Sequence, residues 1–392
     1  MADVMSGGEA VAAALENLGV THVFGIVSVH NLPTYDAIGP RGITLVRCRH
    51  EQAAAHAADG FARATGRLGV VLASTGPGTT NTMSGLYEAQ FGSSPVLLVT
   101  GQVESRFLGK GKGFLHENDS QAAMLATVTR RVETIRRTED IARVVTAVAD
   151  DARLGRPQPA AVEIPIDLQY ARAAVEVPAP HEPPRVAVDE AALAKAAGLL
   201  DGAERPLIWA GGGVVSAGAS TALVALAERL DAPVITTIEG RGAIAEDHRL
   251  ALGPRSERPA LGGTIAEADV VLAVGTRFQN YATRVWALDI PGTLVHLDAD
   301  PGVIGLNYRA DVAVVGDARS GLEQLAGLVK GGRSDAGYVA RARKSVEADL
   351  EQSREEIGPD HWEICAAVRR LLPPEAPIVR DSTVPSYLWG NR

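Results

Sequence analysis

Short runs of apolar residues alternate along the chain with longer segments in which apolar residues recur every three or four positions. The runs have the length and composition of buried strands, and the longer segments have the period of amphipathic helices. Ser6 is expected to cap a first helix, because Val11, Leu15 and Leu18 follow it at helical spacing. In the first part of the chain, strands are expected at residues 21–27, 43–48, 69–74, 95–101 and 162–167. Strands that alternate with helices predict a parallel sheet covered by helices on both faces.

The same rhythm repeats after a proline-rich segment at residues 176–184, which is expected to be a stiff, extended linker. In the second part, strands are expected at residues 207–210, 234–237, 270–275, 294–298 and 312–316. The predicted fold class is therefore α/β, with two consecutive doubly wound parallel-sheet domains and the start of a third.

The pattern divides the chain into four parts, at residues 1–175, 187–335, 336–360 and 361–392. The first two parts are the predicted domains. The third is charged and places Val346 and Leu350 four residues apart, which predicts an exposed connecting helix. From His361 a helix and then a strand at residues 378–381 are expected. Because one helix and one strand cannot bury a sheet face, the last part is interpreted as the opening of a third domain.

Composition and charge exclude several classes of protein. A formal net charge of -9, without a basic stripe, argues against nucleic acid as a partner. The two cysteines, Cys48 and Cys365, are too few and too far apart for a disulfide framework or a cysteine-based metal site, and they suit a reducing compartment. Neither a signal-peptide pattern nor an apolar run of membrane-spanning length occurs, so the protein is expected in the cytoplasm, with no membrane partner.

Residues 49–66 (RHEQAAAHAADGFARATG) predict a helix, because alanine dominates them and a glycine supplies the C-terminal stop. Glu51, Ala54, Ala55 and Ala58 lie on one face of this helix. That face carries one carboxylate followed by methyl groups, so a flat ring or another helix could approach it closely. The alternative is an ordinary surface helix with a solvated glutamate.

The strand expected at residues 69–74 leads directly into the sequence TGPGTTN at residues 75–81. A helix through Met83 and Leu86 follows. A strand that ends in a Gly/Pro turn at the start of a helix is a ligand-binding geometry of open α/β sheets.

Together these two segments resemble the pyrimidine-binding domain of thiamine diphosphate (ThDP) enzymes of the acetolactate synthase and benzaldehyde lyase type. In that family the glutamate at the helix start hydrogen-bonds the aminopyrimidine ring of the cofactor and promotes the tautomer that removes the C2 proton. The resemblance therefore implies that Glu51 is catalytic. It also implies that the cofactor is bound by Thr75, Gly76, Pro77, Gly78 and Asn81.

The second predicted domain resembles the central domain of the same family, which carries FAD in some members, ADP in others and no ligand in many. Gly211, Gly275, Asp298 and Gly316 stand at the ends of predicted strands, where such sheets bind ligands. The glycine run at residues 211–213 does not form a complete dinucleotide fingerprint. A tight turn with no ligand therefore stays open beside FAD and ADP.

Two histidines are candidates for the chemistry on the substrate. His30 lies in the segment 27–33, which replaces a Pro-Gly turn common in the family, at a position where benzaldehyde lyase-like relatives carry a histidine that faces the reacting carbonyl. A histidine suits proton relay near neutral pH, and the alternative is a loop histidine bonded to the backbone. His116, in the loop 113–121, stands where acetolactate synthases usually carry glutamine, which implies a different substrate or proton-transfer task.

In this family Mg²⁺ ties the cofactor diphosphate to a Gly-Asp-Gly motif, followed by an asparagine, in the third domain. Toward the end of this sequence the only Gly-Asp pair, Gly316-Asp317, is followed by Ala318 and lies in the second predicted domain. The anchoring site for ThDP and Mg²⁺ is therefore expected to be absent from these 392 residues, and no metal ligand is predicted. The 392-residue chain alone is expected to be inactive and to hold ThDP weakly.

The resemblance implies an enzyme that forms or cleaves C–C bonds in 2-keto acids or acyloins and works as a homodimer or homotetramer. The adjacent histidine pair of pyruvate decarboxylase-type relatives is not seen, which favours carboligation or cleavage over simple decarboxylation. The alternative is a non-catalytic nucleotide-binding or regulatory protein that has lost the diphosphate-binding domain. The DNA that follows codon 392 distinguishes the two, because the enzyme needs a segment with the Gly-Asp-Gly motif.

Overall fold

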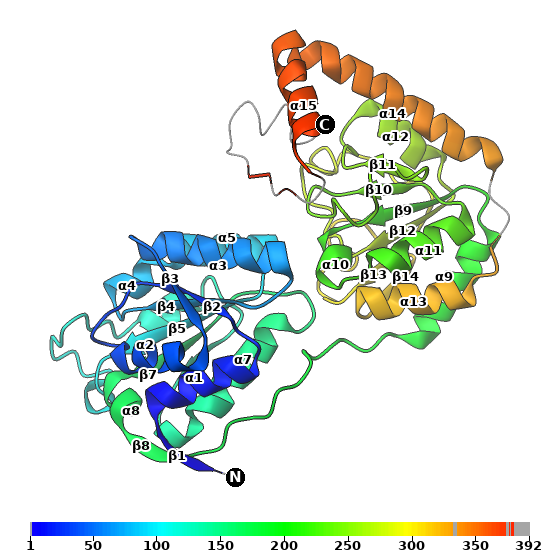
Figure 1. Cartoon of the computed structure of the whole chain (residues 1–392). Coiled ribbons are helices and arrows are strands. Elements are labelled where there is room, and N and C mark those ends of the chain that lie inside the picture. Colours follow the sequence, from blue (N-terminus) through cyan, green and yellow to red (C-terminus); the bar gives the residue numbers. More distant parts are fainter. Residues whose placement is uncertain (1, 332–334, 374–375, 377, 380–392) are drawn as a thin grey trace. The chain divides into compact units, whose positions relative to one another are not determined.

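The computed structural model describes residues 2–331, 335–373, 376 and 378–379, and the chain forms two compact units, Met1–Arg185 and Val186–Arg392 (Figure 1). Each unit is a sheet with helices on both faces, so the two α/β domains with parallel sheets are confirmed. No helix within the described ranges is long and apolar enough to cross a bilayer. The last two residues of the strand expected at 378–381 lie outside the described residues.

A six-stranded parallel sheet forms the centre of the first unit, in the order β3-β2-β4-β5-β7-β6. Its strands are β2 (His22–Gly25), β3 (Thr44–Arg47), β4 (Gly69–Ala73), β5 (Val96–Gln102), β6 (Val132–Thr134) and β7 (Ala160–Pro165). A separate antiparallel pair joins β1 (Asp3–Ser6) to β8 (Arg172–Val175). β1, β6 and β8 were not expected, because strands this short depend on partners that are distant in sequence.

Helices cover both faces of this sheet (Figure 1). They are α1 (Gly7–Asn17), α2 (Leu32–Ile38), α3 (Glu51–Thr65), α4 (Pro77–Asn81), α5 (Met83–Gly92), α6 (Gln121–Leu125), α7 (Ile141–Arg153) and α8 (Ile166–Tyr170). One face packs against α1, α2 and α7, and the other against α3, α5 and α6. Along β4, Val70 and Leu72 point to the first layer and Val71 and Ala73 to the second, so the strand is buried on both sides.

The first helix begins as predicted. Ser6 Oγ accepts a hydrogen bond from the Glu9 amide at 3.2 Å, and Glu9 Oε2 accepts from the Ser6 amide at 2.6 Å. This reciprocal capping box satisfies two amide groups that a helix start leaves without partners.

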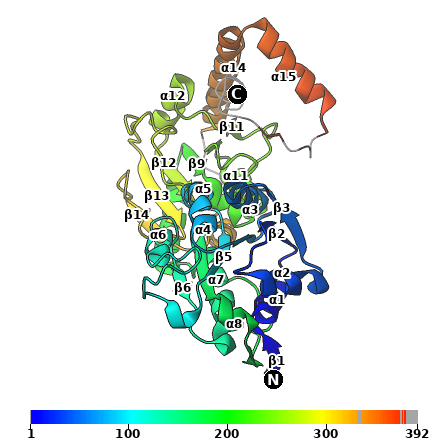
Figure 2. The same ribbon diagram turned by 90° about the vertical axis from the view of Figure 1, so that its left-hand side faces the viewer.

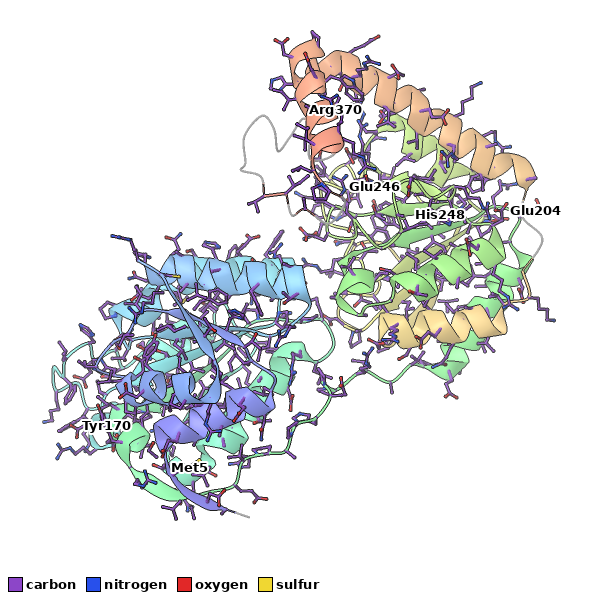
Figure 3. The ribbon with its side chains drawn as sticks, in the orientation of Figure 1. Met5, Tyr170, Glu204, Glu246, His248 and Arg370 are labelled. Carbon is purple, nitrogen blue, oxygen red and sulfur yellow. The ribbon has the colours of Figure 1, made fainter. Side chains whose placement is uncertain are left out.

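The second unit is built around another six-stranded parallel sheet, in the order β11-β10-β9-β12-β13-β14. Its strands are β9 (Pro206–Ala210), β10 (Val234–Thr236), β11 (Ala251–Gly253), β12 (Val270–Val274), β13 (Thr293–Asp298) and β14 (Val312–Val315). Its helices are α9 (Glu190–Gly202), α10 (Gly212–Ser216), α11 (Ser220–Leu230), α12 (Pro259–Glu267), α13 (Ala318–Leu328), α14 (Ala336–Ile357) and α15 (Pro359–Leu371). One face packs against α9, α11 and α13, and the other against α12 and α14. Glu246, which pairs with Arg241 at 2.6 Å, and His248 lie on the connection between β10 and β11 (Figure 3).

The expectation that residues 336–360 form an exposed helix is only partly right. α14 does span this stretch, but it runs alongside α12 and contributes to the core (Figure 2). Tyr338 is 1% exposed, and its hydroxyl donates to the Thr264 carbonyl at 2.8 Å. Asp349, also buried, pairs with Arg255 at 2.6 Å and with Arg258 at 2.7 Å. Asp349 of this helix therefore forms internal ion pairs, and the charge pattern of a sequence does not distinguish such a residue from one on a solvated surface.

Candidate functional site

The helix that begins at Glu51 is held in a fixed orientation by its start, its end and one packed face. His50 is the N-cap, and its Nδ1 accepts from the Gln52 amide at 3.2 Å. Gly66, with φ of 67°, ends the helix as predicted. Ala55 is fully buried, and a Cβ added to Gly85 of α5 would lie 2.5 Å from the Ala55 Cβ. The close contact between α3 and α5 therefore requires small residues, and it places the partly buried Glu51 at the N-terminal end of its helix.

The turn after β4 brings the second predicted segment to Glu51. Asn81, at the end of α4, donates from Nδ2 to Glu51 Oε2 at 3.0 Å. A Cβ added to Gly78 would lie 3.4 Å from Glu51 Oε1 and 2.8 Å from the Ser74 Cβ. One carboxylate oxygen is thus held by Asn81, and the other lies on the side of Gly78.

Gly76 gives this turn its shape. Its φ of 58° and ψ of -111° lie in a region that favours glycine, and an added Cβ would lie 2.3 Å from the His116 carbonyl oxygen. Pro77 then occupies the first turn of α4, where its missing amide hydrogen costs nothing. Thr75 is fully buried, and its hydroxyl donates to the side-chain oxygen of Gln121 at 3.1 Å. The Thr75 side chain therefore points into the protein and helps to hold the turn.

The structure also brings the two predicted histidines together. The rings of His30 and His116 have centroids 5.4 Å apart, His30 being 1% exposed and His116 exposed. His30 Nδ1 lies 3.3 Å from Ser74 Oγ. Burial, with a further contribution from His116, lowers the pKa of His30 below its usual 6.5, so this imidazole is neutral at pH 7. The backbone around His30 is anchored as well, since its carbonyl accepts from Gln169 Nε2 at 2.8 Å.

Sequence reasoning missed three residues of this region: Ser74, Gln121 and Glu163. Ser74 lies beside both His30 and Gly78. Gln121 and Glu163 form a buried pair behind Gly76, with Gln121 Nε2 donating to Glu163 Oε1 at 2.7 Å. A signal for the pair was available, because Glu163 is the one charged residue in the otherwise apolar stretch 160–165.

In the second unit, the glycines at the strand ends meet one another. A Cβ added to Gly211 would lie 2.1 Å from the Gly275 carbonyl oxygen, and the Gly213 amide donates to that same oxygen at 3.0 Å. This close approach of two backbone turns requires glycine whether or not a nucleotide binds, so these residues do not decide between FAD, ADP and no ligand.

The residues around Glu51 fit an aminopyrimidine ring. Such a ring needs a carboxylate that can hold or release a proton and a flat space beside it. Glu51 Oε1 is such a carboxylate oxygen, and Gly78 places no side chain against it. Among the described residues, no group of three or more His, Cys, Asp or Glu side chains is placed to hold a metal ion.

Comparisons with known proteins match both units of the chain. Residues 5–124 match the family model "Thiamine pyrophosphate enzyme, N-terminal TPP binding domain", and residues 193–325 match "Thiamine pyrophosphate enzyme, central domain". A probable acetolactate synthase large subunit of Methanocaldococcus jannaschii is 39% identical over 333 residues, which cover 82% of this chain and 56% of that protein. The acetolactate synthase isozyme 3 large subunit of Escherichia coli is 34% identical over 337 residues, covering 83% of this chain and 58% of that protein.

A third relative matches along nearly the whole chain. A probable 2-ketoarginine decarboxylase of Pseudomonas aeruginosa is 36% identical over 392 residues, which cover 99% of this chain and 69% of that protein. The chain spans little more than half of the length of the acetolactate synthase subunits that it matches. With two matching domain models and relatives at this level of identity, the chain belongs to the thiamine pyrophosphate enzyme family.

Proposed function

We propose that this chain is the pyrimidine-binding and central portion of a ThDP-dependent enzyme that forms or cleaves C–C bonds in 2-keto acids or acyloins, as a carboligase or lyase similar to acetolactate synthase. One observation carries the proposal: Asn81 holds Glu51 Oε2 at 3.0 Å while Oε1 lies toward Gly78, which has no side chain to cover it. A carboxylate with one fixed and one available oxygen is suited to exchange a proton with a ring that lies beside Gly78.

The other residues around Glu51 take supporting roles. The backbone from Thr75 to Gly78 borders the ring, and Asn81 keeps the Glu51 carboxylate in place. His30, neutral at pH 7, can accept a proton from the substrate, and the exposed His116 can pass it to solvent. When bound, thiamine diphosphate supplies a nucleophilic carbon and an electron sink for the bond that changes.

The proposal extends to the assembly. Mg²⁺ and the diphosphate would be held outside this chain's described residues, on the diphosphate-binding domain of a neighbouring subunit in a homodimer or homotetramer. The outer face of α5 supports such a partner, because Tyr87 and Phe91 are 57% and 54% exposed on one face of that helix. The two free cysteines, Cys48 and Cys365, are compatible with the reducing environment of the cytoplasm.

Decarboxylation is the second candidate. The observation that favours it is the match to a probable 2-ketoarginine decarboxylase, which covers 99% of this chain, compared with 82% for the acetolactate synthase subunit of Methanocaldococcus jannaschii. A 2-keto acid with a cationic side chain is the corresponding substrate class.

The experiment that tests the proposal is a screen of the complete gene product with ThDP and Mg²⁺. A panel of 2-keto acids, with and without a second carbonyl compound, separates the candidates: a carboligase gives an acyloin or a hydroxy-keto acid, whereas a decarboxylase gives a free aldehyde. The visible spectrum of the purified protein reports FAD in the central domain. A complete protein that neither binds ThDP nor turns over any member of the panel would favour the non-catalytic alternative.

A further inference from the structure

Glu163 is a buried carboxylate in the middle of β7. Its side chain is 2% exposed, and the other five residues of the strand are buried and apolar. Burying a carboxylate is costly unless hydrogen bonds compensate for the lost water. Glu163 Oε1 accepts from Gln121 Nε2 at 2.7 Å, and Oε2 accepts from Thr134 Oγ1 at 2.7 Å. The groups that donate to this buried carboxylate are therefore the ones whose positions it fixes.

Glu163 holds the side-chain amide of Gln121 in one orientation. The Gln121 oxygen accepts from the Gly76 amide at 2.7 Å and from Thr75 Oγ1 at 3.1 Å, while its nitrogen donates to Glu163 and to the Gly101 carbonyl at 3.1 Å. A rotated amide would place its NH₂ against the Gly76 N–H and its oxygen against the Glu163 carboxylate. Only the observed orientation satisfies all four contacts, and Gln121 is fully buried.

Gln121 in turn fixes the Gly76 turn. The Gly76 backbone lies in a conformation that few residues adopt, so a hydrogen bond to its amide helps to keep it there. The Gly76 carbonyl accepts from the Thr80 amide and from Thr80 Oγ1, both at 2.9 Å. The turn thereby sets the start of α4, and the end of α4 carries Asn81 to Glu51.

We infer that Glu163 is a positioning residue of the Glu51 site. It acts through Gln121 on the Gly76 turn, and through α4 on the contact between Asn81 and Glu51. The effect of Glu163 on catalysis rests on the proposed function, whereas its effect on the Gly76 turn does not. Glu163→Ala leaves the Gln121 nitrogen without this partner. Glu163→Gln keeps the arrangement, because its side-chain oxygen can accept from Gln121 and its NH₂ can donate to Thr134.

The direct test is hydrogen exchange of the Gly76 amide in the 392-residue chain without cofactor. We expect exchange about tenfold faster in Glu163→Ala and within about threefold of wild type in Glu163→Gln. Val162→Ala is the matched control: it is the neighbouring residue on β7, fully buried on the opposite face of the sheet, so its cavity destabilises the unit without touching Gln121. If Glu163→Ala does not fold, Gln121→Met tests the same step, because it removes the bond to Gly76 and should accelerate its exchange equally.

Two results would overturn the inference. In the first, the Gly76 amide of Glu163→Ala or of Gln121→Met exchanges no faster than that of Val162→Ala. In the second, the Gly76 amide of Glu163→Gln exchanges as fast as that of Glu163→Ala.

A second experiment measures C2-proton exchange of ThDP in the complete enzyme, where Glu163→Ala should slow this exchange about tenfold. Glu51→Gln separates the role of Glu163 from the proposed function, because it should leave Gly76 exchange unchanged. If C2-proton exchange survives in Glu51→Gln, the proposed function fails while the Gly76 result still decides the role of Glu163.

Discussion

Asn81 donates a hydrogen bond to Glu51 Oε2 at 3.0 Å and so joins the last residue of α4 to the first residue of α3. The two residues come from different helices, and each helix is set by its own glycine: Gly66 ends α3, and Gly76 precedes α4. The bond leaves Glu51 Oε1 on the side of Gly78. We propose that this oxygen exchanges a proton with the aminopyrimidine ring of ThDP.

Replacing Gly78 with alanine should crowd the side of Glu51 on which the ring is proposed to lie. The new Cβ would lie 3.4 Å from Glu51 Oε1 and 2.8 Å from the Ser74 Cβ. We expect the dissociation constant of ThDP in the complete enzyme to rise at least about tenfold, because Ser74 or the Gly78 backbone must shift to relieve this clash and so disturb the surroundings of Glu51. Isothermal titration calorimetry with ThDP and Mg²⁺ measures this.

Gly60→Ala is the matched control for that substitution. Gly60 lies inside α3, and an added Cβ would meet nothing within 4 Å. Alanine in an open helical position is expected to raise the free energy of unfolding by up to about 1 kcal/mol and to leave ThDP affinity unchanged. If Gly78→Ala binds ThDP as tightly as Gly60→Ala does, the ring does not lie beside Gly78.

Local signals were sufficient to predict the elements on which the site is built. The alanine content and terminal glycine of α3, and the apolar run of β4 before its Gly/Pro turn, depend on neighbours in sequence, and both elements are where they were expected. The bond between Gln121 and Glu163 could not be predicted this way, because its partners are 42 positions apart and meet only when β7 pairs beside β5. The buried face of α14 was missed for a similar reason: Asp349 is buried only because Arg255 and Arg258 reach it from the connection before α12.

His116→Gln should alter substrate preference more than stability. His116 is exposed and belongs to a loop, so its replacement removes little packing, although its φ of 62° is a conformation that histidine adopts more readily than glutamine. We expect the ratio of turnover on two 2-keto acids to change by about tenfold or more while the melting temperature moves by only a few degrees. Steady-state kinetics on paired substrates and a thermal melt provide the comparison.

The same variant has a readout that needs no cofactor. His116 is one cause of the lowered pKa of His30, so its removal should raise that pKa, as followed by an NMR titration of the imidazole. His56→Gln, on the exposed side of α3, should leave it unchanged. A large loss of stability in His116→Gln with the same substrate profile would mean that His116 is structural.

His296 should make the second unit less stable in acid. It is 1% exposed, and burial lowers its pKa from 6.5 to about 4. Below pH 6.5 the unfolded chain takes up a proton that the folded chain does not, so the free energy of unfolding falls as the pH is lowered from 6.5 to about 4. Between pH 7 and pH 5 this group should account for about 2 kcal/mol of the loss.

Urea unfolding at the two pH values measures this effect. All four tryptophans lie after residue 186, so tryptophan fluorescence reports the second unit. His296→Gln keeps a donor for the Thr276 carbonyl, which His296 Nε2 contacts at 2.9 Å, but does not titrate. Its stability should therefore depend less on pH than that of the wild type, and equal losses in the two proteins would show that another group carries the acid sensitivity.

The measurement that bears most directly on Glu51 is C2-proton exchange of ThDP in the complete enzyme, followed by NMR after transfer to D₂O. Glu51→Gln should slow this exchange by at least about a hundredfold, because an amide cannot gain or lose the proton that a carboxylate moves. Glu88→Gln, an exposed carboxylate on α5 that pairs with Arg63 at 3.2 Å, should exchange at the wild-type rate. A Glu51→Gln protein that binds ThDP and exchanges the C2 proton at nearly the wild-type rate would show that Glu51 does not move this proton.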